Sequence, residues 1–233
     1  MSVDLQTILQ RSSARHKHLC PRQVLGARIG LAGAAAVALA VPRRDKRLVV
    51  ILETDGCFAD GVEVATGCTI GHRTLRVEDC GKVAATFINV NRGVAMRVAP
   101  QLDLRERAHA YAPDEPRHYF AQLRAYQLMP DAELLTCQAV TLTPAIAAIV
   151  SRPGVRVNCM GCGEEIINER EQWIDEQIFC RTCAGCGYYT VVPAAPSIVG
   201  LPARSGTVAS DGSAICHTEP LTGEVPDQQP IYA

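Results

Sequence analysis

Two closely spaced cysteine pairs constrain the fold of this chain more than any other feature of its sequence. The segments CMGC and CRTC give Cys159-x2-Cys162 and Cys180-x2-Cys183, with seventeen residues between the pairs. Each pair can present two thiolates from one tight turn, and this spacing is typical of tetrahedral structural zinc. So short a segment cannot bury enough apolar surface to fold alone, so the metal would hold it together. The sequence therefore predicts a small zinc-finger domain with four cysteine ligands.

A further pair overlaps the second one, because Cys183 and Cys186 are also separated by two residues. Either Cys180 with Cys183 or Cys183 with Cys186 can complete a four-thiolate site. We choose Cys180 with Cys183, which leaves Cys186 without an assigned role.

The residues before the finger alternate between helical and strand patterns. Helices are expected over 3–13, 21–41, a stretch between Gly56 and Gly67, 116–128, and from Pro130. On the 116–128 helix, Tyr119, Phe120 and Leu123 are expected to face inward. Strand-like runs cover 48–53, 83–90, 94–98 and part of 134–142. The runs at 83–90 and 94–98 are separated by three residues that include a glycine, which indicates a hairpin. The mixture predicts an α+β fold.

Composition changes abruptly at Ser151-Arg152-Pro153-Gly154. Cysteines crowd the next segment, and beyond Val192 the chain is rich in Pro, Gly, Ser and Thr with little periodicity. We therefore expect an α+β domain over 1–150, the zinc finger over 151–192 and a flexible tail over 193–233.

The overall composition narrows the class of protein. The 233 residues are 48% hydrophobic and carry a formal net charge of −1, so we expect a folded core and no nucleic-acid partner. We expect no membrane span, because the apolar run 29–41 is short and flanked by charge. Since no secretory signal is evident, we expect a cytoplasmic protein. Its eleven cysteines then favour metal binding or thiol chemistry over disulfides.

A second candidate site lies in the segment RHKHLCP, where His16, His18 and Cys20 occupy alternate positions before Pro21. In an extended segment these three side chains would share one face. A residue before proline favours extended geometry, and proline favours the first position of a helix, so Cys20 is expected at a helix N-cap. The helix dipole would there favour its thiolate. The pattern predicts a metal site or a reactive cysteine.

Three further residues extend this candidate site. Cys57 follows the apolar run 48–53, in a loop of the kind that often carries function. Asp60 can be a ligand, a base or the N-terminal acid of a helix. Cys68, in the segment TGCT, is expected in the cluster, with a packing role as the alternative.

Several of these segments together resemble the FmdE family, which takes its name from a component of formylmethanofuran dehydrogenase. They are HKHLCPRQVLGARIG, ETDGCFADGVEVATGCTIG and CGKVAATF. CMGCGEEIINEREQW and CRTC resemble the treble-clef zinc finger, also found in DksA/TraR-like proteins, that some family members carry. The resemblance covers about residues 10–187. It implies an α+β core with a His/Cys cluster, here His16, His18, Cys20, Cys57, Asp60 and Cys68, with Lys82 nearby. Lys17, Arg22 and Cys80 depart from the family pattern.

The resemblance implies a metal-binding protein, either an accessory subunit or a small enzyme in one-carbon, molybdopterin-linked redox metabolism. A second metal ion, zinc, nickel or iron, is expected at His18, Cys20 and Cys57, because mixed imidazole and thiolate ligands suit these metals. The alternatives are a zinc-finger module that binds protein or nucleic acid, and a metal storage or delivery protein. We expect a homodimer and, as partners, subunits of a redox enzyme.

Overall fold

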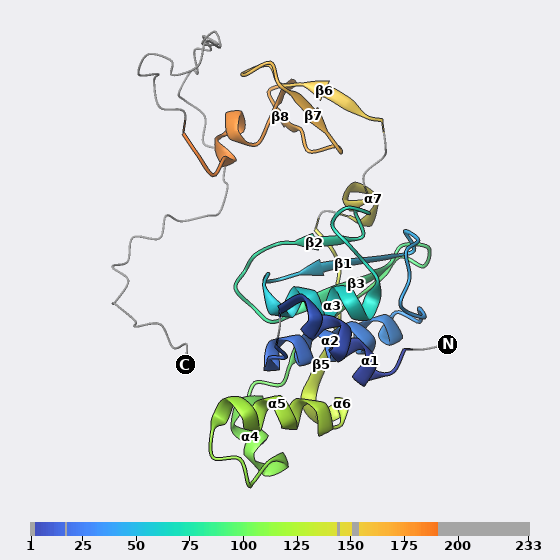
Figure 1. Cartoon of the computed structure of the whole chain (residues 1–233). Coiled ribbons are helices and arrows are strands. Elements are labelled where there is room, and N and C mark those ends of the chain that lie inside the picture. Colours follow the sequence, from blue (N-terminus) through green and yellow to red (C-terminus); the bar gives the residue numbers. More distant parts are fainter. Residues whose placement is uncertain (1–2, 17, 144, 151–153, 191–233) are drawn as a thin grey trace. The chain divides into compact units, whose positions relative to one another are not determined.

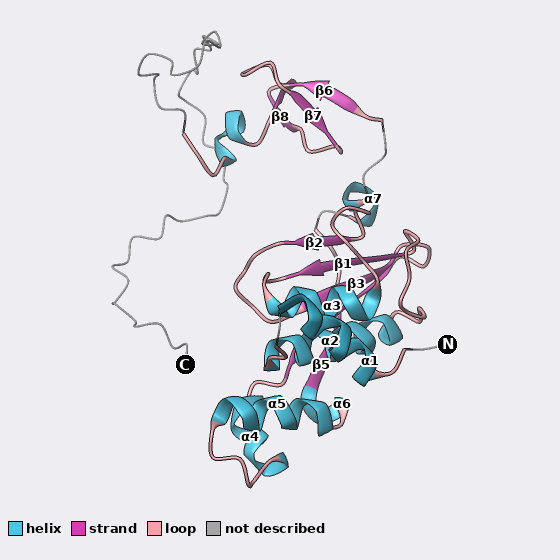
Figure 2. Cartoon of the chain, in the orientation of Figure 1, coloured by secondary structure: helices cyan, strands magenta, loops and turns pink. Residues whose placement is uncertain are grey.

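The computed structural model of the chain describes residues 3–16, 18–143, 145–150 and 154–190 (Figure 1). The chain divides into two compact units, Met1–Ile149 and Val150–Ala233. This division lies beside the boundary expected after residue 150, whereas the tail expected over 193–233 lies outside the described residues. Helices and strands are mixed along the first unit (Figure 2), which confirms the α+β prediction.

The first unit is built on a five-stranded sheet with the strand order β2-β1-β3-β4-β5. β1 runs parallel to β2, and the other neighbouring strands are antiparallel. The strands are β1 (Leu48–Leu52), β2 (Leu75–Val77), β3 (Ala85–Asn89), β4 (Val94–Pro100) and β5 (Leu135–Ala139). β3 and β4 form the predicted hairpin, with Ala85 opposite Val98 and Asn89 opposite Val94.

Helices α1, α2 and α3 lie together beside this sheet (Figure 1). The helices of the unit are α1 (Leu5–His16), α2 (Pro21–Ala36), α3 (Cys57–Thr66), α4 (Leu104–Tyr111), α5 (His118–Leu128), α6 (Asp131–Leu134) and α7 (Ile146–Ile149). The core packs α2 and α3 against β1 and β3, and a Cβ atom on Gly33 would lie 2.1 Å from the ring of Phe87. The small residues of α2 therefore face the interior of this chain.

Three expectations about the helices need correction. α2 ends at Ala36 and not at 41, because the chain leaves the helix at Ala38, whose φ is 56°. On α5 the buried residues are Ala121, Ala125 and Tyr126, while Tyr119 is 44% exposed. Short alanine side chains let α5 pack closely, and this turns Tyr119 outward. The pattern does not predict α4, because its eight residues are mostly polar.

The second unit contains two small hairpins and one helical turn. β6 (Arg156–Asn158) pairs with β7 (Glu165–Ile167), and β8 (Gln172–Ile174) pairs with β9 (Gln177–Phe179). The helical turn η1 (Thr182–Cys186) follows. Among the residues that the structure describes, no helix of either unit is long and apolar enough to cross a membrane.

Candidate functional site

The candidate site of the first unit lies where α2 and α3 begin. Gly26 of α2 lies against Phe58 and Gly61, while Gly30 lies against Ala65, so the two helices run in the same direction. A Cβ atom on Gly26 would lie 2.2 Å from the carbonyl oxygen of Phe58, which means that only glycine permits this approach. The N-terminal ends of both helices, with their positive partial charge, therefore meet at one place.

Cys20 is the N-cap of α2, as its position before Pro21 predicts. The Gln23 backbone N–H donates to Cys20 Sγ at 3.4 Å, and the Cys20 backbone N–H donates to Gln23 Oε1 at 2.9 Å. The buried Gln23 side chain also donates to the carbonyl oxygen and the hydroxyl of Ser12, which ties α1 to this turn. Cys20 is thus held by both its backbone and its thiol.

The expected thiolate at Cys20 is not what its surroundings favour. Cys20 is only 7% exposed, and this burial raises the pKa of its thiol above the ordinary value. The neighbouring Cys57 side chain raises the pKa of Cys20 further. Hydrogen bonds from the start of α2 oppose this shift without reversing it. In the metal-free protein Cys20 is therefore a neutral thiol at neutral pH.

Cys57 is the first residue of α3 and is half-buried. Gly56 before it has a φ of +70°, a left-handed conformation that turns the chain from β1 into the helix. The interaction with Cys20 places the two thiols side by side. Tyr119 of α5 also borders them, because its pKa is raised first by burial and then by Cys20 and Cys57. Sequence reasoning missed Tyr119, which it assigned to the core.

His16 is not on an extended segment, because α1 continues through it. Its Nε2–H donates to the Asp60 carboxylate on the first turn of α3. Arg15 joins the same group, with its guanidinium 3.3 Å from Asp60 and 3.0 Å from Glu63. The prediction that His16 shares one extended face with His18 and Cys20 is therefore wrong. Asp60 nevertheless brings an imidazole and a carboxylate to the start of α3.

His18 is exposed, and its ring centre lies 6.5 Å from that of His16. Lys82 and Arg22 are exposed as well, and Lys17 lies outside the described residues.

The structure does not bring Cys68 to this cluster. Cys68 follows the left-handed C-cap Gly67, at the other end of α3 from Cys57. Ten helical residues separate the two ends by roughly 15 Å. Cys68 is fully buried, its Sγ lies 3.7 Å from the Leu48 carbonyl oxygen as a donor, and burial raises the pKa of its thiol. These contacts are those of a packed core residue.

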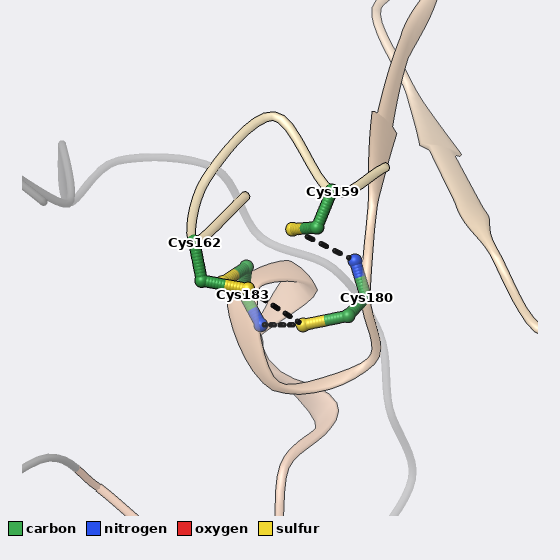
Figure 3. A group of neighbouring side chains, drawn as sticks. All are labelled: Cys159, Cys162, Cys180 and Cys183. Atoms are coloured by element: carbon green, nitrogen blue, oxygen red, sulfur yellow. Dashed lines mark hydrogen bonds between the residues drawn. The ribbon is translucent and has the colours of Figure 1, made fainter. Parts of the chain in front are cut away.

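In the second unit, Cys159, Cys162, Cys180 and Cys183 face one another (Figure 3). Their sulfur atoms all lie within 4.8 Å of one another, so one metal ion can contact all four. These are the four cysteines that the sequence spacing predicts, and Cys186 is not among them. Within residues 3–16, 18–143, 145–150 and 154–190, no other set of three or more His, Cys, Asp or Glu side chains meets this distance.

Local backbone geometry prepares the sulfur atoms for a cation. The first pair lies between β6 and β7, and the second pair between β9 and η1. The Cys180 backbone N–H donates to Cys159 Sγ at 3.2 Å, and the Cys183 N–H donates to Cys180 Sγ at 3.4 Å. Although burial opposes it, such N–H groups lower the pKa of Cys159 to about 6. Burial and the neighbouring thiols raise the pKa of Cys183.

Comparison with known proteins gives a consistent picture. One curated relative, a "probable S-adenosyl-L-methionine-binding protein" of Archaeoglobus fulgidus, is 33% identical over 97 residues. The matched region is 40% of this chain, but the chain spans only about a quarter of that relative's length.

A solved structure shares the fold. It is an FmdE-like protein of tungsten formylmethanofuran dehydrogenase from Syntrophus aciditrophicus, with a TM-score of 0.52 and 20% identity. The superposition covers 81% of this chain and 96% of that one. The family model described as "FmdE, Molybdenum formylmethanofuran dehydrogenase operon" matches residues 15–136, which contain the thiols of α2 and α3. Because that match covers just over half of the chain, the protein belongs to the FmdE family.

Proposed function

We propose that this is a cytoplasmic FmdE protein that acts in one-carbon, molybdopterin-linked redox metabolism, as an accessory subunit or a small enzyme. Its chemistry would take place at the common start of α2 and α3. Membership of the FmdE family and the name of the Syntrophus aciditrophicus relative support the metabolic context.

One observation carries the choice of site. Cys20 and Cys57 begin two parallel helices in glycine contact, and the hydrogen-bonded pair of His16 and Asp60 lies at the same end of α3. Thiols beside an imidazole and a carboxylate can bind a metal or transfer protons and electrons, while a purely structural junction needs none of these groups.

For the second unit we propose that the four-cysteine group holds zinc in a treble-clef finger. The order of elements supports this: a first cysteine pair between β6 and β7, the hairpin of β8 and β9, and a second pair that leads into η1. Four thiolates in a closed group suit structural zinc, which has no open position for a substrate.

For the first unit we propose a second metal ion, zinc, nickel or iron, with Cys20 and Cys57 as thiolate ligands and His18 as imidazole ligand. The two adjacent thiols fit such an ion. His16 would stand beside it, oriented by Asp60. When bound, the metal would supply Lewis acidity or redox chemistry, and the chain would supply the ligands and an oriented imidazole.

Metal analysis of the full chain tests both sites. The intact protein is expected to hold two ions, and Cys180→Ser is expected to remove one of them. Cys20→Ala and His18→Ala are each expected to remove the other, while Cys137→Ala, which changes an exposed cysteine on β5, keeps both. If Cys20→Ala and His18→Ala retain the wild-type metal content, the site is not a metal centre.

The metabolic role has its own test. The purified chain is added to a formylmethanofuran dehydrogenase preparation that lacks an FmdE component, and the rate is compared with that of Cys57→Ser. A wild-type effect that Cys57→Ser loses supports the proposal. Equal effects of both proteins, or none, favour the alternatives of a binding module or a metal carrier. S-adenosyl-L-methionine binding is titrated in parallel, because the Archaeoglobus fulgidus relative is named for it.

A further inference from the structure

The two thiols at the start of α2 and α3 differ in accessibility. Cys20 is 7% exposed and its thiol is engaged by the Gln23 N–H, whereas Cys57 is only half-buried. Cys57 follows the turn at Gly56, where even an added Cβ would meet no atom within 4 Å, so this approach is open. A reagent from solvent therefore reaches Cys57 first.

The close contact of the helices keeps both thiols at one end of the pair. A Cβ on Gly61 would lie 2.3 Å from the Gln23 carbonyl oxygen, and one on Gly26 would lie 2.2 Å from that of Phe58. Gln23 is three residues after Cys20, and Phe58 follows Cys57 directly. Neither thiol is in a disulfide, and each can reach the other through side-chain rotation without unfolding of a helix.

We propose that Cys57 and Cys20 form a redox-active dithiol, in which exposed Cys57 attacks a small-molecule disulfide and buried Cys20 resolves the product. This activity goes beyond metal binding. It rests on the proposed function only in that both use the same two thiols.

The reaction balances with a disulfide such as oxidised glutathione as the oxidant. The Cys57 thiol loses its proton and attacks one sulfur atom, which breaks the S–S bond and releases one glutathione thiol. The Cys20 thiol then loses its proton and attacks Cys57 Sγ of the mixed disulfide, which releases the second glutathione. Two electrons pass from the protein dithiol to oxidised glutathione, and the two protons end on the released thiols.

Substitutions by serine separate the two steps. Cys20→Ser is expected to fold, because serine is a favoured N-cap and can accept the same hydrogen bond from Gln23. It lacks the resolving thiol, so glutathione should remain on Cys57. Cys57→Ser lacks the attacking thiol, so Cys20 should take up little glutathione.

The test treats the full, metal-loaded chain with oxidised glutathione and identifies the products by peptide mass spectrometry. Wild type is expected to yield a peptide pair joined through Cys20 and Cys57, Cys20→Ser a glutathione adduct on Cys57, and Cys57→Ser neither. Cys80, an exposed cysteine of another loop, is the internal control and should carry an adduct in all three proteins. Circular dichroism confirms that each variant is folded.

Two results would overturn the inference. One is wild type that accumulates glutathione on Cys57 without the joined peptides, and the other is a Cys20→Ser protein that carries an adduct on Cys80 alone. Metal content is measured on the same samples. Joined peptides in a chain that never holds a second ion refute the second metal and keep the dithiol, whereas a second ion without joined peptides does the reverse.

Discussion

Single residues set the geometry of the candidate site, and some of them are readable from the sequence. The dipeptide Cys20-Pro21 predicts an N-cap, and the structure places Cys20 there because local backbone preferences decide it. The pKa of Cys20 is not readable in this way. Burial raises it, and burial depends on residues such as Tyr119 that are far away in the chain. Local stereochemistry is therefore predictable, whereas the electrostatic environment requires the tertiary structure.

Gly26→Ala is expected to destabilise the first unit, since the new Cβ would lie 2.2 Å from a backbone carbonyl oxygen. Either α2 or α3 must shift, and overpacking of this kind costs about 1–3 kcal/mol of the free energy of unfolding. Gly71→Ala is the matched control, because its Cβ would meet no atom within 4 Å. Urea denaturation of both variants checks the prediction, and equal midpoints would contradict it.

Gln23→Leu is expected to be equally harmful for a different reason. The buried Gln23 side chain serves the Cys20 backbone N–H and two oxygen atoms of Ser12. Leucine fills the space but leaves these polar groups without their partner, at about 1–3 kcal/mol for each buried group left unsatisfied. Thermal unfolding measures the loss, and a Tm unchanged from wild type would show that water replaces the amide.

At the scale of whole elements, periodicity predicts what lies close in the chain. The runs before and after Asn91-Arg92-Gly93 form the β3–β4 hairpin, because a short turn makes their pairing local. β2 is three residues long and pairs in parallel with β1, so its partner lies far along the chain, and no local pattern marks it. The sequence misplaces His16 for a related reason, because α1 continues for three residues beyond its expected end at 13.

The four-cysteine group behaves as one element, which makes its ligands separable by mutation. Cys180→Ser is expected to lose one metal ion per chain and to unfold residues 154–190, while the first unit keeps its helical circular dichroism signal. Cys186→Ser is the matched control and is expected to keep the ion, because its sulfur is not in the group. Retention of metal by Cys180→Ser together with loss by Cys186→Ser would reverse this assignment.

Metal affinity of the same group is expected to rise with pH. The pKa of Cys159 is lowered to about 6, so this thiol is ionised at pH 7, whereas the pKa values of Cys162 and Cys183 are raised and both keep their protons. Binding must release these two protons, so affinity should rise by about a hundredfold per pH unit near neutrality. Competition with a chromophoric chelator at two pH values measures the slope, and a slope of zero would exclude this mechanism.

The whole molecule combines two units whose chemistries are readable to different degrees. The four-cysteine group is predicted completely, because ligand spacing within two short turns determines it. The first-unit cluster is predicted in part: Cys20, Cys57 and Asp60 lie at one end of α3, and Cys68 lies at the other. Sequence motifs indicate which residues matter, but helix length and direction decide which of them meet.

A homodimer stays a prediction, and its original reason has weakened. The small residues of α2 face α3 and Phe87 of the same chain, so they provide no surface for a partner. Exposed apolar residues of the second unit, such as Trp173 at 64% exposure, offer a different surface. Light scattering at micromolar concentration tests the state, and Trp173→Ser is expected to weaken the dimer. A monomeric wild type removes the idea.

The capping role of Cys20 has a consequence for how this family can diverge. The helix needs only a small side chain that accepts a hydrogen bond, a task that serine, aspartate and asparagine also perform. A lineage could therefore lose the sulfur through a single base change and inherit an intact, well-expressed protein. Among descendants of this chain, persistence of the fold would reveal nothing about retention of the chemistry, and the identity of residue 20 would be the more informative trait.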